Sequence, residues 1–185
     1  MKPDESHSDS WVKQFYLTHS TDENNLIGMI NDGYIYSGIY ANRSRLFGSP
    51  TSRYVYLSLL GDISSNFQNI TLFLSDRVLF NRSFRYAFGW FTEDALEKTI
   101  KVDHKRDNVL EHLESLNDHI LKSNNVTSHE ILLKKKVNLD KYLVAVCCKN
   151  NISSNTINLI KSIYPKVKIL DNNPISASNL YEMMS

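Results

Sequence analysis

Apolar stretches of strand length constrain the fold of this chain more than any other feature of its sequence. They are interspersed with amphipathic helical stripes, but strand and helix do not alternate steadily. Alternating or continuous apolar runs indicate strands, and stripes with a period near 3.6 indicate helices. A doubly wound parallel sheet needs a helix after almost every strand, which this order of segments lacks. The pattern therefore favours an α+β fold built on a mixed sheet.

The expected elements follow from these patterns. We expect strands over 11–18, 53–60, 69–74, 130–137, 141–148 and 167–170, and a short strand or extended arm over 34–36. Helices are expected over 22–32, 107–122 and 153–164. Ser20, Thr21 or Asp22 can cap the first helix, and Gly33 can end it. The region 37–52 has glycine and proline but no periodicity, which predicts a long loop, a length typical of functional segments.

The chain length predicts one domain. At 185 residues with 42% hydrophobic residues, the chain can bury one sizeable core. We expect a disordered N-terminal tail over residues 1–10, a single domain over 11–171, and a loose C-terminal tail over 172–185. The polar start is not a signal peptide, and no stretch approaches ~18 apolar residues. A cytoplasmic or otherwise intracellular protein without a membrane partner is therefore expected.

Charge and cysteine content exclude several classes of site. The formal net charge of +1 lacks the basic excess typical of nucleic-acid and membrane proteins, although a local patch can exist within a balanced total. The adjacent pair Cys147 and Cys148 offers neither a relaxed disulfide nor zinc spacing, so we expect two buried or half-buried thiols and no metal site. The richness in Asn, Lys and Ile suits an A/T-rich genome, viral or microbial.

The usual glycine-rich nucleotide motifs, the metalloprotease motif and the hydrolase nucleophile motif are absent from the sequence. Three other segments carry candidate chemistry. The first is FYLTHST at 15–21, a strand that delivers His19 and is followed by a capped helix ending in Gly33. The second is YVYLS at 54–58. The third and most specific is SHEILLKKKVNLDKYLVAVC at 128–147, in which Glu130 opens a strand.

Together these segments resemble the His-Tyr-Glu class of ADP-ribosyltransferases, which includes poly(ADP-ribose) polymerases and viral and microbial relatives. The resemblance covers about residues 15–149 and implies a split mixed β-sheet with flanking helices. It implies that NAD is the substrate, that His19 bonds a ribose hydroxyl, and that Tyr56, with Tyr54 and Ser58 on the same strand, holds the nicotinamide. The backbone of Ser20, where the family usually has Gly, would bond the carboxamide.

The resemblance assigns catalysis to Glu130. In the family this carboxylate bonds a ribose hydroxyl and stabilises the positive charge that develops as nicotinamide leaves. An acceptor then attacks the ribose carbon; the expected acceptor is an unidentified protein or nucleic acid. Arg82 and Arg85 suit contacts to the NAD pyrophosphate or remain surface charges. Arg43 and Arg45 lie in the long loop, a candidate lid or acceptor-recognition element.

Two alternatives remain open at this point. One is an RNA 2′-phosphotransferase, which uses the same fold and NAD and needs basic residues such as Arg43, Arg45 and Arg53 around the site. The other is a non-catalytic interaction module that keeps the fold and has lost NAD. The side chain of Ser20 at the usual glycine position favours this second alternative, because it crowds the approach to the carboxamide.

Overall fold

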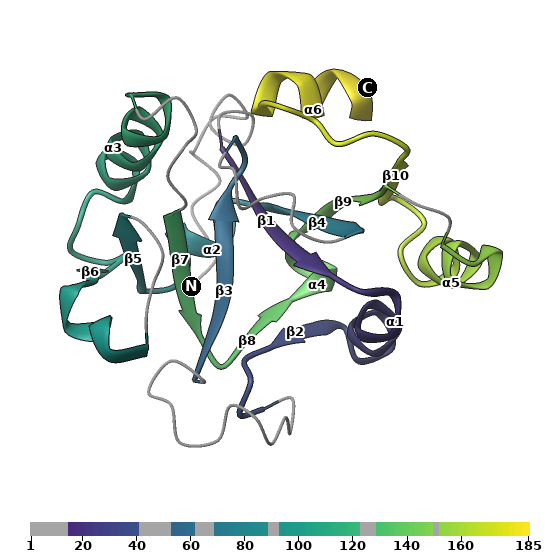
Figure 1. The fold of residues 1–185 in the computed structure, drawn as a ribbon, viewed down its shortest axis with the longest axis horizontal. Helices are drawn as coiled ribbons and strands as arrows, with labels where there is room; N and C mark the ends of the chain where they lie inside the picture. Colours follow the sequence, from purple (N-terminus) through teal and green to yellow (C-terminus); the bar gives the residue numbers. More distant parts are fainter. Residues whose placement is uncertain (1–14, 41–52, 62–68, 89–92, 123–128, 150–151) are drawn as a thin grey trace.

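An eight-stranded mixed sheet forms the centre of the molecule (Figure 1). The computed structural model describes residues 15–40, 53–61, 69–88, 93–122, 129–149 and 152–185. The sheet has the order β10-β9-β4-β1-β3-β7-β5-β6, and β2 and β8 form a separate two-stranded ribbon. Strands β9 and β10 are parallel, whereas the other neighbours in the sheet are antiparallel. The predicted α+β class and mixed sheet are confirmed.

The elements have the following bounds. The strands are β1 (Tyr16–Thr21), β2 (Tyr34–Tyr36), β3 (Tyr54–Leu59), β4 (Ile70–Ser75), β5 (Phe84–Phe88), β6 (Ile100–Val102), β7 (His129–Lys134), β8 (Lys136–Asn138), β9 (Leu143–Cys148) and β10 (Lys168–Leu170). The helices are α1 (Glu23–Asp32), α2 (Arg77–Phe80), α3 (Val109–Lys122), α4 (Leu139–Tyr142), α5 (Ser154–Ile163) and α6 (Ala177–Met184), with a 3₁₀ helix, η4 (Glu93–Lys98).

The sheet is divided between β1 and β3. These two strands share only the pairs Leu17–Leu59 and Thr18–Ser58, whereas β1 continues along β4 for six pairs. Beyond Thr18 the two strands therefore separate while each keeps its outer neighbour. This separation is the split that the resemblance predicted, and it opens where β1 reaches His19.

Two hydrophobic clusters hold helices against opposite faces of the sheet. The larger cluster joins Leu17, Leu57 and Leu72 to Leu26 of α1, and also includes buried residues of α3 and α5. The smaller joins Tyr16, Phe73, Ala145, Cys147 and Leu170 to Leu180 of α6. Figure 1 shows α6 above, and α1 and α5 below, the part of the sheet that contains β9 and β10. Burial on both faces explains why β4 is apolar along nearly its whole length.

The local helix signals are confirmed by the structure. The Asp22 side chain accepts a hydrogen bond from the Asn25 backbone N–H and caps α1, and Gly33 ends that helix with a left-handed φ of 73°. Ser153 caps α5 in the same way. These signals lie within a few residues of the turn they control, so they need no tertiary information.

Several expectations differ from the structure. Strand β1 is shifted toward the C-terminus and includes His19–Thr21, because pairing with β4 extends to Thr21; residues 11–14 of the predicted strand lie outside the described residues. Strand β5, over the aromatic stretch 84–88, is not among the expected elements. The segment predicted as a loose C-terminal tail contains α6, whose Leu180 is completely buried, because that leucine fills the second face of the sheet.

The predicted strand over 130–137 is divided in two at Lys135. This residue has a φ of 69°, in the left-handed region that side chains rarely adopt. Its N–H donates to Arg53 O at 3.0 Å, and its carbonyl accepts from Ser37 N–H at 2.8 Å. The chain therefore leaves the main sheet after β7 and pairs with β2 as β8. Within the described residues, no helix is long and apolar enough to cross a membrane.

Candidate functional site

His19 lies at the point where β1 separates from β3. Its Nδ1 atom is 3.0 Å from the backbone carbonyl oxygen of Tyr56, so the imidazole bridges the two strands where backbone pairing stops. A carbonyl oxygen can only accept, so Nδ1 carries the proton and Nε2 of the neutral ring is an acceptor. The His19 side chain is half-buried at this split.

Tyr56, Ser58 and Glu130 share one face of two adjacent strands. Tyr56 pairs with Leu132 across β3 and β7, and side chains two residues apart on a strand point the same way. Glu130 is therefore the diagonal neighbour of Tyr56, with Cα atoms about 7–8 Å apart. All three side chains are half-buried, so they are neither sealed in the core nor fully solvated.

Ser20 and Tyr54 extend the same face in different directions. Thr18 pairs with Ser58 and donates its hydroxyl hydrogen to the Ser58 carbonyl at 3.3 Å, so Ser20, two residues further on, shares its face of the sheet. Tyr54 is opposite Lys134, at the end of β3 away from Glu130, and is only 6% exposed. By strand register, five of the six predicted site residues share one face. His19, between Thr18 and Ser20, alternates to the other face, and its Nδ1 contacts the Tyr56 carbonyl at the split.

Arg82 and Arg85 hold the protein's own backbone. The Arg82 guanidinium donates to the carbonyl oxygens of Lys134 and Lys136 and so clamps the turn between β7 and β8. Burial lowers the pKa of Arg82. Arg85 donates to the Thr99 hydroxyl at 2.9 Å and to the Leu96 carbonyl at 3.3 Å, which ties β5 to η4 and to the residue that follows it. These protein partners account for the positions of both guanidinium groups, so neither arginine requires a pyrophosphate as its partner.

Most of the predicted loop 37–52 lies outside the described residues, which stop at residue 40 and resume at residue 53. Arg43 and Arg45, predicted as lid or acceptor contacts, belong to the segment 41–52. Its role therefore stays a prediction. Arg53, directly after this segment, is exposed at the start of β3.

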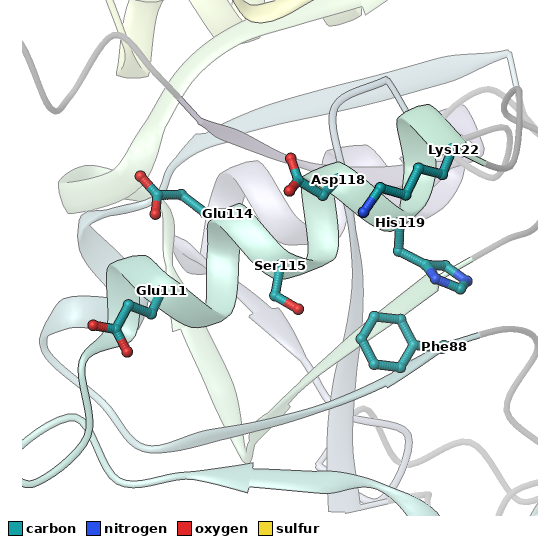
Figure 2. A pocket seen from close by; sticks show the side chains of 7 residues that line it. All are labelled: Phe88, Glu111, Glu114, Ser115, Asp118, His119 and Lys122. Carbon is teal, nitrogen blue, oxygen red and sulfur yellow. The ribbon is translucent and has the colours of Figure 1, made fainter.

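A surface pocket beside α3 has the wrong character for a dinucleotide. It has a volume of about 420 Å³, and Figure 2 shows the side chains that line it: Phe88, Glu111, Glu114, Ser115, Asp118, His119 and Lys122. Three carboxylates repel a pyrophosphate. Because Ala87 pairs with Glu130, the preceding and following residues of β5 face the other side of the sheet, so Phe88 and this pocket are separated from the Glu130 face.

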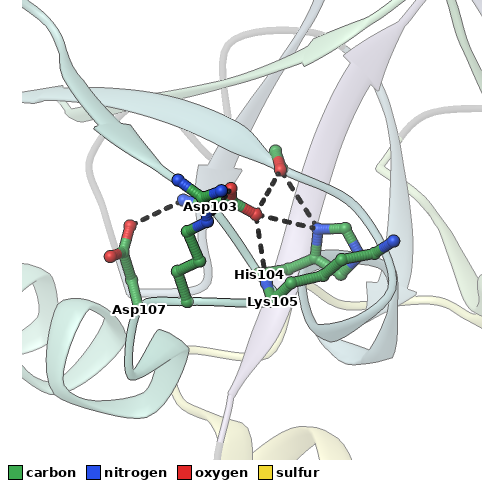
Figure 3. Close-up of polar contacts among 6 residues, drawn as sticks. Asp103, His104, Lys105 and Asp107 are labelled. Atoms are coloured by element: carbon green, nitrogen blue, oxygen red, sulfur yellow. Dashed lines mark hydrogen bonds and ion pairs between the residues drawn. The ribbon is translucent and has the colours of Figure 1, made fainter.

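Ser83, His104 and Asp103 contain the residue types of a hydrolase triad but not its arrangement. The Ser83 hydroxyl lies 3.1 Å from His104 Nδ1 and 3.3 Å from Asp103 Oδ1, so both partners meet the serine directly. In a triad the carboxylate instead orients the histidine through its second nitrogen. Asp103 also accepts from Lys105 N–H, and Asp107 accepts from Asp103 N–H (Figure 3). The group stabilises the turn before α3.

The two cysteines do not supply a nucleophile. Cys147 is buried and Cys148 half-buried, as predicted. Burial raises the pKa of each thiol to about 11, so both stay protonated near neutral pH. Groups of three or more His, Cys, Asp or Glu that could hold a metal are also absent from the described part of the chain.

The sequence alone did not identify two positioning contacts. Arg82 gave no local signal, because its partners are backbone carbonyls more than fifty positions away in the chain. Buried His129, next to Glu130, packs against the imidazole of His119 at 4.8 Å and the ring of Phe88 at 5.9 Å. This aromatic cluster anchors the start of β7 and therefore the backbone that carries Glu130.

Comparison with solved structures identifies proteins that share the fold of this chain. A Thermus sp. 2.9 structure described as DarT in complex with NAD+ superposes with a TM-score of 0.56 at 12% identity, covering 84% of this chain and 95% of that one. The same protein in complex with ADP-ribosylated ssDNA gives 0.57 at 14% identity, covering 84% and 94%. The chain therefore has a DarT-like fold, which confirms the predicted ADP-ribosyltransferase-like fold.

Sequence relatives place the chain in a family. "Uncharacterized protein L54" of Acanthamoeba polyphaga mimivirus is 37% identical over 182 residues, covering 94% of this chain and 99% of that protein. Residues 12–116 match the family described as "Family of unknown function (DUF5846)". The chain therefore belongs to this family of unknown function, and its own fold is DarT-like.

Proposed function

We propose that this protein is an NAD-dependent ADP-ribosyltransferase that cleaves the bond between nicotinamide and ribose and transfers ADP-ribose to an acceptor. The observation that carries the proposal is that β1, β3 and β7 are adjacent: His19 contacts the Tyr56 carbonyl at the split, and Glu130 lies diagonally across from Tyr56. Three residue types predicted from distant sequence segments lie on three adjacent strands. The NAD-bound Thermus structure with the same fold supports the substrate assignment.

His19 orients the ribose in this proposal. The Tyr56 carbonyl fixes the proton on Nδ1, so Nε2 accepts a hydrogen bond from a ribose hydroxyl. The aromatic ring of Tyr56 contributes a flat apolar surface for the nicotinamide, a geometry that offset ring pairs favour. In this proposal, His19 on β1 orients the ribose and Tyr56 on β3 binds the nicotinamide.

Glu130 acts at the reacting carbon. The bond between ribose C1′ and the nicotinamide nitrogen breaks, and its electron pair leaves with nicotinamide. Positive charge develops on the ribose, and the Glu130 carboxylate stabilises it electrostatically. The acceptor's nucleophilic atom forms the new bond to C1′ and loses its proton to Glu130 or water.

The central test measures nicotinamide release from labelled NAD by purified wild type, Glu130→Gln and the matched control Glu97→Gln, whose residue is exposed on η4. We expect Glu130→Gln to lose about 100-fold or more of the release rate, and Glu97→Gln to match wild type. Unchanged release by Glu130→Gln refutes the catalytic assignment. Lack of release by wild type, with or without a cell lysate as acceptor source, refutes the enzymatic proposal.

A second test separates the two nitrogens of His19. His19→Asn keeps a donor near the Nδ1 position and removes the Nε2 acceptor. We expect its Tm without ligand to stay close to that of wild type, while the thermal shift caused by millimolar NAD disappears. A ligand that binds only the native state must raise stability, so a retained shift contradicts the role of Nε2.

An assay with phosphorylated RNA and the NAD thermal shift together discriminate the two alternatives. Removal of phosphate from 2′-phosphorylated RNA, without transfer to other acceptors, identifies an RNA 2′-phosphotransferase. A wild-type protein without any NAD shift is an interaction module, and Ser20→Gly then tests the reason. If the Ser20 side chain blocks the carboxamide, the glycine variant gains an NAD shift that wild type lacks.

A nucleic-acid acceptor is favoured over a protein side chain. The Thermus structure with the same fold contains ADP-ribosylated ssDNA. Incubation with labelled NAD and either a single-stranded oligonucleotide or a protein lysate, followed by nuclease or protease digestion, identifies the labelled class. Label confined to protein contradicts the nucleic-acid acceptor but leaves the transferase proposal intact.

A further inference from the structure

The ribbon of β2 and β8 presents an aromatic and cationic face. Tyr34 pairs with Asn138 and Tyr36 with Lys136, so these side chains share one face, while Ile35 and Val137 are completely buried on the other. The Lys136 ammonium lies 3.5 Å from the ring centroid of Tyr34. The Tyr34 and Tyr36 rings are 5.8 Å apart, and both side chains are half-buried.

The turn before this ribbon concentrates positive charge. Lys134, Lys135 and Lys136 are consecutive and exposed. The backbone of exposed Arg53 bonds Lys135, and Arg82 donates to the carbonyls on either side of it. Five cationic residues therefore meet at one corner of the molecule.

The two segments that form the ribbon and its turn contain no acidic residue that could offset the positive charge of this corner. Neither 34–37 nor 134–138 contains Asp or Glu. Asp140, the first acidic residue after β8, is directed elsewhere: its carboxylate lies near Gly33, and it contributes to the raised pKa of Tyr164, to about 12, of which burial is the main cause. The near-zero charge of the whole chain therefore hides a local basic surface.

This corner is continuous with the candidate site. Lys134 shares a strand face with Leu132 and Glu130, and four residue steps of about 3.3 Å separate Lys134 from Glu130 by about 13 Å. The distance is short enough for one extended strand of nucleic acid to contact both.

We propose that the Tyr34–Tyr36–Lys136 face and the Lys134–Lys136 turn, together the basic corner, bind single-stranded nucleic acid and lead it toward Glu130. Lysines contact the phosphates, and Tyr36 offers a ring for base stacking, the combination that single-strand binding proteins use. Half-buried tyrosines distinguish this surface from a merely charged one. The inference rests on the proposed transferase function, because it identifies the binding surface for the acceptor.

The test measures fluorescence anisotropy of labelled ssDNA and ssRNA of about 12 nucleotides, without NAD. The triple variant Lys134→Gln/Lys135→Gln/Lys136→Gln removes the turn's charge. The matched control Lys161→Gln/Lys166→Gln/Lys168→Gln removes three exposed lysines from α5, β10 and the loop between them. Circular dichroism and Tm verify that both variants are folded.

We expect the corner variant to bind about 100-fold more weakly near 0.1 M salt and its salt slope to fall by about 2, since each phosphate contact on a single strand contributes about 0.7. The control triple should retain most of the affinity. Tyr36→Ala should lose about tenfold, from the loss of one stacked base, and Tyr181→Ala on α6 should not.

Other results overturn the proposal. They are undetectable oligonucleotide binding by wild type, equal losses in both triple variants, or Tyr36→Ala binding that matches wild type. A corner variant that loses only its NAD thermal shift overturns it as well, because the lysines would then bind the pyrophosphate. Nicotinamide release by wild type is measured separately, so failure of this surface is distinguishable from failure of the transferase proposal.

Discussion

Asp76 gives a quantitative prediction about the pH dependence of stability. The residue lies between β4 and α2 and is only 2% exposed, and burial raises the pKa of its carboxyl from 3.8 to about 7. Unfolded Asp76 is ionised above pH 3.8, whereas folded Asp76 stays protonated until about pH 7. Between these values the folded state binds more protons than the unfolded state, so the free energy of unfolding falls as pH rises.

The size of the effect follows from the two pKa values. The interval from 3.8 to about 7, at 1.36 kcal/mol per pH unit, corresponds to about 4 kcal/mol. Asp76→Asn keeps the shape of the protonated acid and cannot ionise. We therefore expect the variant and wild type to have similar stability near pH 4, and the variant to be more stable by up to about 4 kcal/mol at pH 8.

The assay is urea unfolding followed by circular dichroism at several pH values from 4 to 8, with Asp118→Asn as the control. Asp118 is exposed on α3, so its substitution should shift stability by a constant small amount. The decisive quantity is the difference between Asp76→Asn and wild type as a function of pH. A difference that stays constant within about 0.5 kcal/mol across this range refutes the argument from burial.

Two further predictions concern the helices that cover the sheet. Glu23 accepts hydrogen bonds from the hydroxyls of Thr156 and Ser153 and from Ser153 N–H, and these bonds lower its pKa. The ionised Glu23 carboxylate stabilises the folded state above pH 4.5, and this stabilisation is lost as the pH falls below that value. The difference in Tm between wild type and Glu23→Gln should therefore narrow between pH 6 and 3. A difference in Tm that does not depend on pH would show that the charge of Glu23 is irrelevant. Leu180→Ala should cost about 2–5 kcal/mol in urea unfolding because the side chain is fully buried, whereas Ile175→Ala, at an 82% exposed position, should cost little. Equal effects of the two would mean that α6 does not pack on the sheet.

The sequence was sufficient for features controlled by near neighbours in the chain. Asp22 and Gly33 define α1, and the leucine stripe defines α3, because caps and helical faces depend on residues within one or two turns. The order of the His, Tyr and Glu motifs along the chain could be predicted for the same reason, because each motif is a short local pattern. These local patterns were sufficient to predict the class of fold and six candidate site residues.

Only the tertiary structure could decide which of these residues meet. The separation of β1 from β3, the bond from His19 to the Tyr56 carbonyl and the left-handed turn at Lys135 all depend on partners far along the chain. Burial of Leu180 similarly depends on a sheet face that the C-terminal sequence does not reveal. The energy of pairing two distant strands depends on how well the surfaces of both strands fit together. A local sequence pattern describes only one of the two strands and therefore does not specify its partner.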